Sequence, residues 1–250
     1  IYDIKHDQLA DSTYWRFDPD LPVRDELSFE DAVDETTELI VQAVGRCCEG
    51  TNRAGVFLSG GLDSRIIIAA LEQLGRRPAT LTYGSPESRD AYYARRVAEQ
   101  AGLAHYTCFQ ADGTWVQQYW RQHLMLTDAS HSWIHMHGIY ALEDARSLMD
   151  VNLSGFAGDG PLSGTNLCNL YVAANDEITY TAAMFYGLTA LENWPGMSET
   201  DEQSLFTEDA FDLVKGKAFR SLHEALAPFS IYAQPLRTEL FLEYAGDIRH

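Results

Sequence analysis

A glycine loop with flanking serines and one carboxylate is the first group of residues in this chain that could do chemistry. Ser59-Gly60-Gly61-Leu62-Asp63-Ser64 follows a short apolar segment and opens a helical pattern. The start of a helix presents unpaired backbone N–H groups and the positive end of the helix dipole, so it can hold an anion without a lysine. Two glycines let the backbone approach the anion, and the serine hydroxyls add donors. Asp63 cannot donate to a phosphate, so its carboxylate indicates a bridging Mg²⁺.

Other nucleotide-binding loops fit this stretch poorly. The sequence contains no G-x-x-x-x-G-K-[ST] with its phosphate-binding lysine, and no G-x-G-x-x-G for a dinucleotide. The alternative is a tight turn from strand to helix, in which Ser59 or Asp63 only caps the helix. The position of the loop between an apolar strand and a helix favours anion binding over that alternative.

A second loop of small residues also follows an apolar segment. It runs Leu153-Ser154-Gly155-Phe156-Ala157-Gly158-Asp159-Gly160. If both loops leave parallel strands, they meet at the edge of the sheet where ligands collect. Asp63 and Asp159 would then flank one phosphate group. Two carboxylates can lie beside a phosphate only if all three share a cation. The alternative is a solvated turn with Asp159 at its surface.

The hydrophobic periodicity predicts an α/β fold, a parallel sheet with flanking helices. Strands are expected at Gly55–Leu58, Ala79–Tyr83, His105–Phe109 and Val151–Ser154. Helices are expected from a capping box at Ser28 to about Val44, and at Leu62–Leu74, Arg89–Ala101, Trp115–Leu126 and His137–Met149. Strands that alternate with helices of about a dozen residues imply crossover connections, and these give parallel strands.

The two ends of the chain follow a different pattern from the middle. The opening through Pro22 is predicted to be irregular, and beyond Gly164 the helices expected are Glu177–Leu191, Glu208–Leu226 and Leu236–Tyr244. We therefore expect residues 1–27 to be a linker or the end of an upstream domain, residues 28–165 to be the α/β core, and residues 166–250 to be a mostly helical remainder. The chain does not begin with Met and ends directly after a helical pattern, so we expect a truncated fragment.

The composition argues against several classes of partner. The formal net charge is −19, from 18 basic and 37 acidic residues, and this predicts no nucleic-acid partner because phosphate backbones are held by dense Lys and Arg. The absence of a long apolar run or a signal peptide predicts no membrane partner and a cytoplasmic location. Cys47, Cys48, Cys108 and Cys168 form no C-x-x-C pair, so they are expected to be buried free thiols.

Both loops resemble those of a known family. The first resembles the pyrophosphate-binding loop of the PP-loop ATP pyrophosphatases, and Leu-Ser-Gly-Gly-Leu-Asp-Ser is most similar to the synthetase domain of the asparagine synthetase family. The second resembles that family's Ser-Gly loop, and Tyr83-Gly84 through Asp90 resembles its adenine-facing strand and the helix after it. The resemblance covers Ser28 to about Gly164 and is weak beyond it. It implies a PP-loop, Rossmann-like fold related to the adenine nucleotide α-hydrolases.

The resemblance also implies roles for individual residues, with ATP and Mg²⁺ as cofactors. Adenosine would lie against Phe57, Tyr83 and Gly84. Pyrophosphate would lie on Ser59, Gly60, Gly61, Asp63 and Ser64, with the α-phosphate near Ser154 and Gly155. The catalytic carboxylates and Mg²⁺ ligands would be Asp63 and Asp159.

The implied activity is an ATP-dependent amide ligase that releases AMP and pyrophosphate. A carboxylate, aspartate or another acid, would be adenylated and then attacked by an amine, or by ammonia from a glutaminase domain outside this chain. Whether the protein is a homodimer is left open.

Some positions depart from the family. Phe156 stands where asparagine synthetases carry a glutamate, the proposed base at the acyl-transfer step, and a phenyl ring cannot accept a proton. Gly160 replaces an acidic residue, and the family's pyrophosphate-contacting lysine has no counterpart. Lys215 and Lys217 are predicted to be solvated in an amphipathic helix. These departures leave open two alternatives, which are other PP-loop chemistry, such as nucleobase amination or tRNA thiolation, and a non-catalytic ATP-binding module.

Several histidines lie close together but do not indicate a metal site. His131, His135 and His137 lack the His-Glu-x-x-His pattern and have no cysteine nearby. In the family this stretch borders the acceptor pocket, so a histidine here, or Asp128, is a candidate for substrate contact. The aromatic residues at Trp115–Trp120 recur at helical spacing, which favours core packing over stacking on a ligand.

Overall fold

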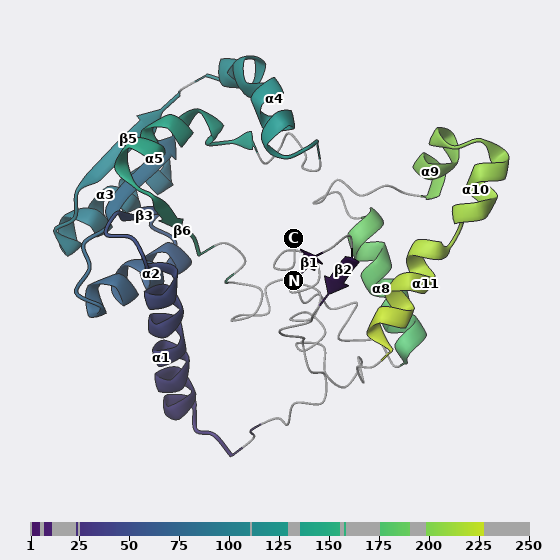
Figure 1. The fold of residues 1–250 in the computed structure, drawn as a ribbon, viewed down its shortest axis with the longest axis horizontal. Coiled ribbons are helices and arrows are strands. Elements are labelled where there is room, and N and C mark those ends of the chain that lie inside the picture. Colours follow the sequence, from purple (N-terminus) through teal and green to yellow (C-terminus); the bar gives the residue numbers. More distant parts are fainter. Residues whose placement is uncertain are drawn as a thin grey trace. The chain divides into compact units, whose positions relative to one another are not determined.

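The computed structural model describes residues 2–5, 8–11, 24, 26–110, 112–129, 136–155, 158, 176–190 and 199–227. These residues belong to two compact units, whose helices and strands are labelled in Figure 1. The α/β unit spans Asp25–Gly158, and the helical unit combines Ile1–Arg24 with Asp159–His250.

Four parallel strands form the centre of the α/β unit. They are β3 (Ala54–Phe57), β4 (Ala79–Gly84), β5 (His105–Phe109) and β6 (Val151–Leu153). Their order in the sheet is β5-β4-β3-β6, and every pairing is parallel, which confirms the predicted sheet. The chain adds β4 and β5 on one side of β3 and then crosses to place β6 on the other. Ligands of open parallel sheets bind where the strand order reverses in this way, so the edge after β3 and β6 is the expected site.

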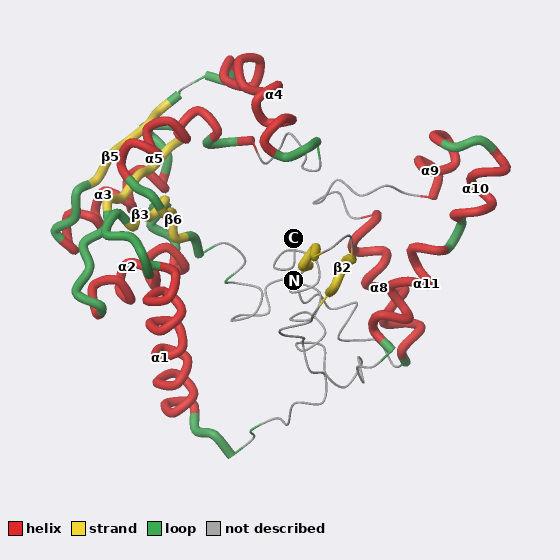
Figure 2. Tube along the Cα trace, viewed as in Figure 1, coloured by secondary structure: helices red, strands yellow, loops and turns green. Residues whose placement is uncertain are grey.

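Helices flank this sheet and connect its strands, as Figure 2 shows. They are α1 (Phe29–Cys47), α2 (Leu62–Gln73), α3 (Arg89–Ala101), α4 (Thr114–Leu126), the short 3₁₀ helix η2 (Ile139–Ala141) and α5 (Leu142–Leu148). Ser28 Oγ accepts a hydrogen bond from Asp31 N at 3.1 Å, and Ser88 Oγ accepts one from Ala91 N at 3.1 Å. These caps satisfy first-turn N–H groups that have no partner within the helix, so α1 and α3 begin where the sequence predicts.

The core of the α/β unit has one part on each face of the sheet. Along β3 and the residue after it, successive side chains point to opposite faces, as the pleat of a strand requires. Val56 and Leu58 are buried against residues of α1, α2 and α3, among them Val44, Leu71 and Ala94. Phe57 packs on the other face, beside Leu81, Ala141, Ala145 and Met149. The two faces together hold the strand ends in place, and therefore the loops that follow them.

The helical unit contains an antiparallel strand pair and several helices. Its elements are β1 (Tyr2–Lys5), β2 (Gln8–Asp11), α8 (Glu177–Ala190), α9 (Glu199–Leu205), α10 (Glu208–Val214) and α11 (Lys217–Leu226). α8 and α11 pack together, with Tyr180, Thr181 and Leu226 fully buried. The rings of Phe185 and Phe219 meet edge to face at 5.5 Å. The helical character predicted for the C-terminal part is confirmed in the described residues.

Some predictions about the elements are wrong. β1 and β2 pair antiparallel within the stretch predicted to be irregular, because both segments mix charged, polar and apolar residues and lack the apolar run that marks β3. The helix predicted at Glu208–Leu226 is two helices, because Gly216 adopts a left-handed φ of 67° between them. Gly138, with φ 89°, likewise delays the helix predicted to begin at His137. The helix predicted at Leu236–Tyr244 lies outside the described residues.

The cysteines within the described ranges are free thiols with different environments. Cys48 is buried and Cys108 is half-buried, but Cys47 is exposed, which corrects the expectation that all of them are buried. Cys48 lies one helical turn after the buried Val44, so both face the sheet, whereas Cys47 is turned away from it. Cys168 lies outside the described residues. Of the helices in the described ranges, none combines the length and the apolar character needed to cross a bilayer.

We expect Cys108 to react more slowly with alkylating reagents than Cys47. Burial raises the pKa of the Cys108 thiol to about 11, and a hydrogen bond and the charge of Asp144 add to the shift. Because this pKa is higher than the unfolded value, the folded chain keeps the proton longer, and the resulting stabilisation is lost as the pH rises through about 11. Alkylation by iodoacetamide, followed by mass spectrometry across a pH series, measures both thiols in one sample. D144N should make Cys108 react at lower pH, and equal rates for Cys47 and Cys108 near pH ~8.5, the ordinary thiol pKa, would contradict this prediction.

Candidate nucleotide site

The glycine loop connects β3 to α2 at the carboxyl edge of the sheet. Gly61 is the N-cap residue of α2, and no described side chain caps the first turn of this helix. The N–H groups of that turn therefore face outward without a side-chain acceptor, which is the arrangement that binds anions at helix starts. Ser59 Oγ accepts a hydrogen bond from the N-cap residue Gly61, whereas the N–H groups of Leu62, Asp63 and Ser64 have no side-chain acceptor among the described residues.

The two serines of the loop hold its shape through short contacts. Ser59 Oγ accepts a hydrogen bond from Gly61 N at 3.2 Å, and Ser64 Oγ donates one to Gly61 O at 3.2 Å. The two hydroxyl oxygens lie 3.3 Å apart. Both hydroxyls are therefore held close to Gly61 and the start of α2, as a phosphate-binding loop requires.

Gly60 allows α3 to pack directly against the loop. Its φ of 74° lies in the left-handed region that glycine adopts most readily. A Cβ added at Gly60 would lie 2.5 Å from Tyr93 Cβ and 2.8 Å from Ala94 N. A side chain at this position would collide with the backbone of α3, so the loop depends on glycine for both conformation and space.

The second loop lies against the first through Asp63. A Cβ added at Gly155 would lie 2.5 Å from Asp63 Cβ and 2.9 Å from Asp63 C, and one added at Gly158 would lie 3.6 Å from Asp63 Cγ. This closeness follows from the pairing of β3 with β6, since the two loops leave neighbouring parallel strands. Asp159 and Phe156 lie outside the described residues, so the pairing of Asp63 with Asp159 stays a prediction.

A pocket of about 160 Å³ lies beside the loop, at the ends of β3 and β4. Its lining consists of Phe57, Leu58, Ser59, Leu81, Thr82, Tyr83, Asp90 and His137. Three residues expected at a nucleotide, Phe57, Ser59 and Tyr83, are thus brought together. Pockets that hold a whole drug-sized ligand span about 300–1,000 Å³, so this one suits a single part of a nucleotide, such as its base.

Tyr83 is the centre of an aromatic group in this pocket. Its ring meets Phe57 edge to face, with centroids 5.5 Å apart, and lies 6.2 Å from His137 and 6.4 Å from Tyr140. Gly138 permits this packing, because a Cβ there would lie 2.7 Å from Tyr83 Cζ. Burial raises the pKa of Tyr83, and the charges of Tyr140 and Asp90 raise it further. The phenol therefore stays neutral and can donate a hydrogen bond to a ligand.

Other predicted residues lie near the site without lining this pocket. Gly84 ends β4 with φ 120°, and its carbonyl accepts a hydrogen bond from Gln110 N at 3.1 Å. Ser154 follows β6 directly. Asp128 has a left-handed φ of 48° just after α4 and does not line the pocket. His131 and His135 lie outside the described residues. Of the candidate acceptor-pocket residues, only His137 is placed at this pocket.

The sequence did not identify two further residues of the site. Asp90 lines the pocket from the first turn of α3, and the sequence placed it only at the end of the stretch that resembles the family's adenine-facing segment, with no role for its side chain. Asn152 Oδ1 accepts a hydrogen bond from Phe57 N at 2.9 Å, which fixes the last residue of β3. That contact depends on the register between β3 and β6, which no local pattern reveals.

Asp63 offers one carboxylate, which suits a cation that takes its other ligands from phosphate oxygens and water. Within the described ranges, no group of three or more His, Cys, Asp or Glu residues could hold a metal ion. Mg²⁺ in nucleotide sites commonly uses one or two carboxylates together with phosphate oxygens and waters. A single carboxylate at the start of α2 fits that pattern, whereas a zinc site would need more protein ligands.

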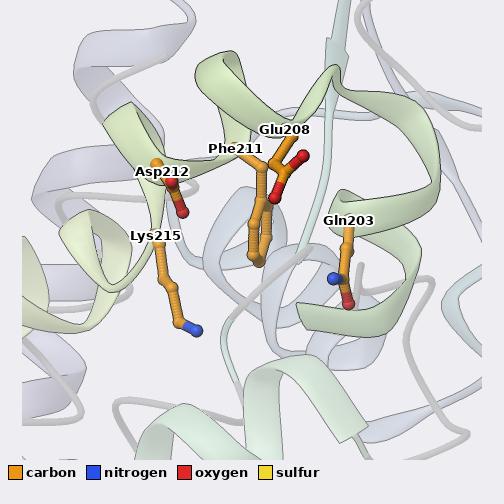
Figure 3. Close-up of a pocket in the computed structure, with 5 residues that line it drawn as sticks. All are labelled: Gln203, Glu208, Phe211, Asp212 and Lys215. Atoms are coloured by element: carbon orange, nitrogen blue, oxygen red, sulfur yellow. The ribbon is translucent and has the colours of Figure 1, made fainter.

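A larger hollow in the helical unit has a different chemistry. Its volume is about 360 Å³. Figure 3 shows the residues that line it, which are Gln203, Glu208, Phe211, Asp212 and Lys215. Lys215 is exposed, as predicted, but it lies in the turn after α10, with its Nζ 5.6 Å from the centre of the Phe211 ring. Two carboxylates oppose one ammonium group here, and this balance disfavours a phosphate ligand.

Comparison with known proteins identifies the family. The family model described as asparagine synthase matches residues 35–237, which is most of the chain. No curated protein matches it. Among solved structures, an NMN synthetase from Francisella tularensis has 15% identity and a TM-score of 0.40, covering 87% of this chain and 95% of its own. An NH3-dependent NAD synthetase from Campylobacter jejuni has 14% identity and a TM-score of 0.37, with coverages of 86% and 96%. Both similarities are too low to support further conclusions, but the family match is extensive: this chain belongs to the asparagine synthase family.

Proposed function

We propose that this protein is an ATP-dependent amide ligase that adenylates a carboxylate and releases pyrophosphate and AMP. The observation that carries the proposal is the meeting of the two loops, with Gly155 packed against Asp63 at the start of α2. Backbone N–H groups at the start of α2, the hydroxyls of Ser59 and Ser64 and the carboxylate of Asp63 all belong to this one loop. Such a combination suits a phosphate chain accompanied by a divalent cation.

In this proposal, ATP spans the pocket and the loop. The base would occupy the pocket beside Phe57 and Tyr83, where aromatic rings offer faces and edges for stacking. The β- and γ-phosphates would lie on Ser59–Ser64, and the α-phosphate near Ser154 and Gly155. Asp63, together with Asp159, would hold Mg²⁺, which neutralises phosphate charge when it is bound.

The reaction would proceed in two displacements. A carboxylate oxygen of the substrate attacks the α-phosphorus, and the bond to the bridging oxygen of the β-phosphate breaks, so pyrophosphate leaves. The nitrogen of ammonia or an amine then attacks the acyl carbon, the acyl–oxygen bond breaks, and AMP leaves. Negative charge grows on the departing pyrophosphate, and the N–H groups at the start of α2 would stabilise it. Because Phe156 cannot accept a proton, the proton lost by the amine would pass to another base or to water.

Product analysis tests this proposal. The whole chain is incubated with ATP, Mg²⁺, a panel of carboxylates and either ammonia or an amine, and the nucleotide products are separated. We expect AMP and pyrophosphate in equal amounts, only when a suitable carboxylate is present. ADP and phosphate would contradict the proposal. ATP binding without turnover of any carboxylate would instead identify a non-catalytic nucleotide-binding module.

A further inference from the structure

Arg65 is a cationic side chain placed at the glycine loop. It follows Ser64 in the first turn of α2 and is exposed to solvent. Its Nε donates a hydrogen bond to Gly61 O at 3.3 Å. In an α-helix, side chains lean toward the N-terminus and cover the turn before them, and the contact with Gly61 shows that Arg65 does so. The guanidinium therefore lies at the first turn of α2, beside the Gly61 carbonyl.

Several other arginines of the α/β unit have charged or aromatic partners. Arg53 forms an ion pair with Asp150 at 3.3 Å, and Arg95 approaches Glu99 at 3.9 Å. Arg89 and Arg96 lie over tyrosine rings. No carboxylate in the described part of the chain forms an ion pair with Arg65. Its contact with Gly61 uses only Nε, which leaves both terminal nitrogens of the guanidinium available for a ligand.

The charges in the loop favour a positively charged side chain beside it when a phosphate is bound. The other donors of the loop are neutral N–H and hydroxyl groups, and Asp63 adds a negative charge beside them. Pyrophosphate is multiply charged, and a guanidinium can donate two parallel hydrogen bonds to one phosphate group. Within the described ranges, Arg65 is the one basic side chain with a hydrogen bond to this loop.

We infer that Arg65 is a pyrophosphate-binding residue, which donates from its terminal nitrogens to the β- and γ-phosphates and stays with pyrophosphate as it leaves. This inference rests on the proposed function. It predicts that Arg65 contributes to the affinity for the β- and γ-phosphates and not to the affinity for the nucleoside and its α-phosphate. AMP, which lacks those phosphates, should therefore be bound without help from Arg65.

Binding measurements on the whole chain test the inference. Calorimetric titrations with Mg²⁺ and ATP, inorganic pyrophosphate or AMP are compared among wild type, R65Q and R65K. We expect R65Q to weaken ATP and pyrophosphate binding by about tenfold to a hundredfold, the usual range for a lost hydrogen bond to a charged group. R65K keeps the positive charge but loses the paired N–H groups of the guanidinium, so its affinities for ATP and pyrophosphate should lie between those of R65Q and wild type. The affinity for AMP should be unchanged in both variants.

R146Q is the matched control. Arg146 is exposed on α5. The carbonyl of its neighbour Ser147 accepts a hydrogen bond from Arg53, which directly precedes β3, so Arg146 lies at the edge of the sheet opposite to the loop. R146Q removes the same charge from the same unit and should leave all three affinities unchanged.

Each remaining outcome is decisive. Unchanged pyrophosphate affinity in R65Q, equal losses for AMP and pyrophosphate, or an equal loss in R146Q would each overturn the role of Arg65 while leaving the proposed function standing. If R65Q does not fold, wild-type pyrophosphate affinity in R65K would overturn the inference, and a selective loss would support it. A wild-type protein that binds neither ATP nor pyrophosphate would overturn both the inference and the proposed function.

Discussion

Replacing Gly60 by alanine is expected to destabilise the α/β unit by more than about 2 kcal/mol and to abolish ATP binding. Two effects add at this position. Alanine is strained at a φ of 74°, and its Cβ would lie 2.5 Å from Tyr93 Cβ and 2.8 Å from Ala94 N. Since α3 is anchored to the sheet by Ala91, Ala94 and Ala98, which are buried, the loop must give way. That movement would displace Ser59 and the start of α2 together.

Two other glycines separate these effects. Gly75 has a φ of 68° but nothing within 4 Å of an added Cβ, so G75A should cost only the backbone strain of about 1–2 kcal/mol and leave ATP binding intact. Gly113 has neither a left-handed φ nor a close neighbour but is the N-cap residue of α4, so G113A should cost only the weaker capping by alanine, about 0.5–1 kcal/mol, and leave ATP binding intact. Thermal unfolding and calorimetric ATP titration of the three variants measure both quantities. If G60A behaves like G75A, the packing of α3 on the loop does not control the site.

Replacing Asp63 by asparagine is expected to remove the dependence of ATP binding on Mg²⁺. The amide keeps the shape of the side chain, so its packing against Gly155 should survive, but it loses the negative charge that a hard cation requires. We expect ATP affinity in the presence of Mg²⁺ to fall by at least about tenfold. Loss of a residue that only hydrogen-bonds to a metal ligand already lowers metal affinity by about 10–100-fold, and loss of a ligand itself should cost no less. AMP affinity should change little.

Chelation gives the internal control for this variant. In excess EDTA, wild type should bind ATP no more tightly than D63N does, because its Asp63 carboxylate then faces the phosphates without a cation. D34N, on the exposed face of α1, removes a carboxylate elsewhere in the same unit and should leave Mg²⁺-dependent binding unchanged. A D63N protein that retains full Mg²⁺-dependent affinity would show that Asp63 is not a ligand, and the role proposed for the loop would need revision.

The strands and the loops after them could be predicted because their signals are local. The change from an apolar run to Ser59-Gly60-Gly61 and then to helical spacing marks β3, the turn and α2 within twenty residues. Parallel strands also predict that both loops lie at one edge. That β6 is the direct neighbour of β3, and therefore that Gly155 reaches Asp63, depends on the order β5-β4-β3-β6, and this order is a property of the whole sheet.

What could not be predicted depends on contacts between distant segments. Asp90 reads as an ordinary first-turn acid of α3, and only the packing of that helix beside β4 brings it to the pocket. Arg65 reads as a solvated helix residue, and only its folding back onto Gly61 places it at the loop. The break at Gly216 was missed because a single glycine between two amphipathic helices does not interrupt the apolar periodicity.

The contacts between Ser59, Gly61 and Ser64 also bear on how fast a ligand can enter the loop. Because each hydroxyl already has a neighbour in the loop, the loop should keep this shape by itself and need no ordering step before a phosphate arrives. An arriving phosphate oxygen would then trade places with an existing partner, so the net heat released per donor should be modest. Association should be limited by diffusion and steering rather than by loop closure, and differences in affinity among ligands should arise mainly in how slowly they depart.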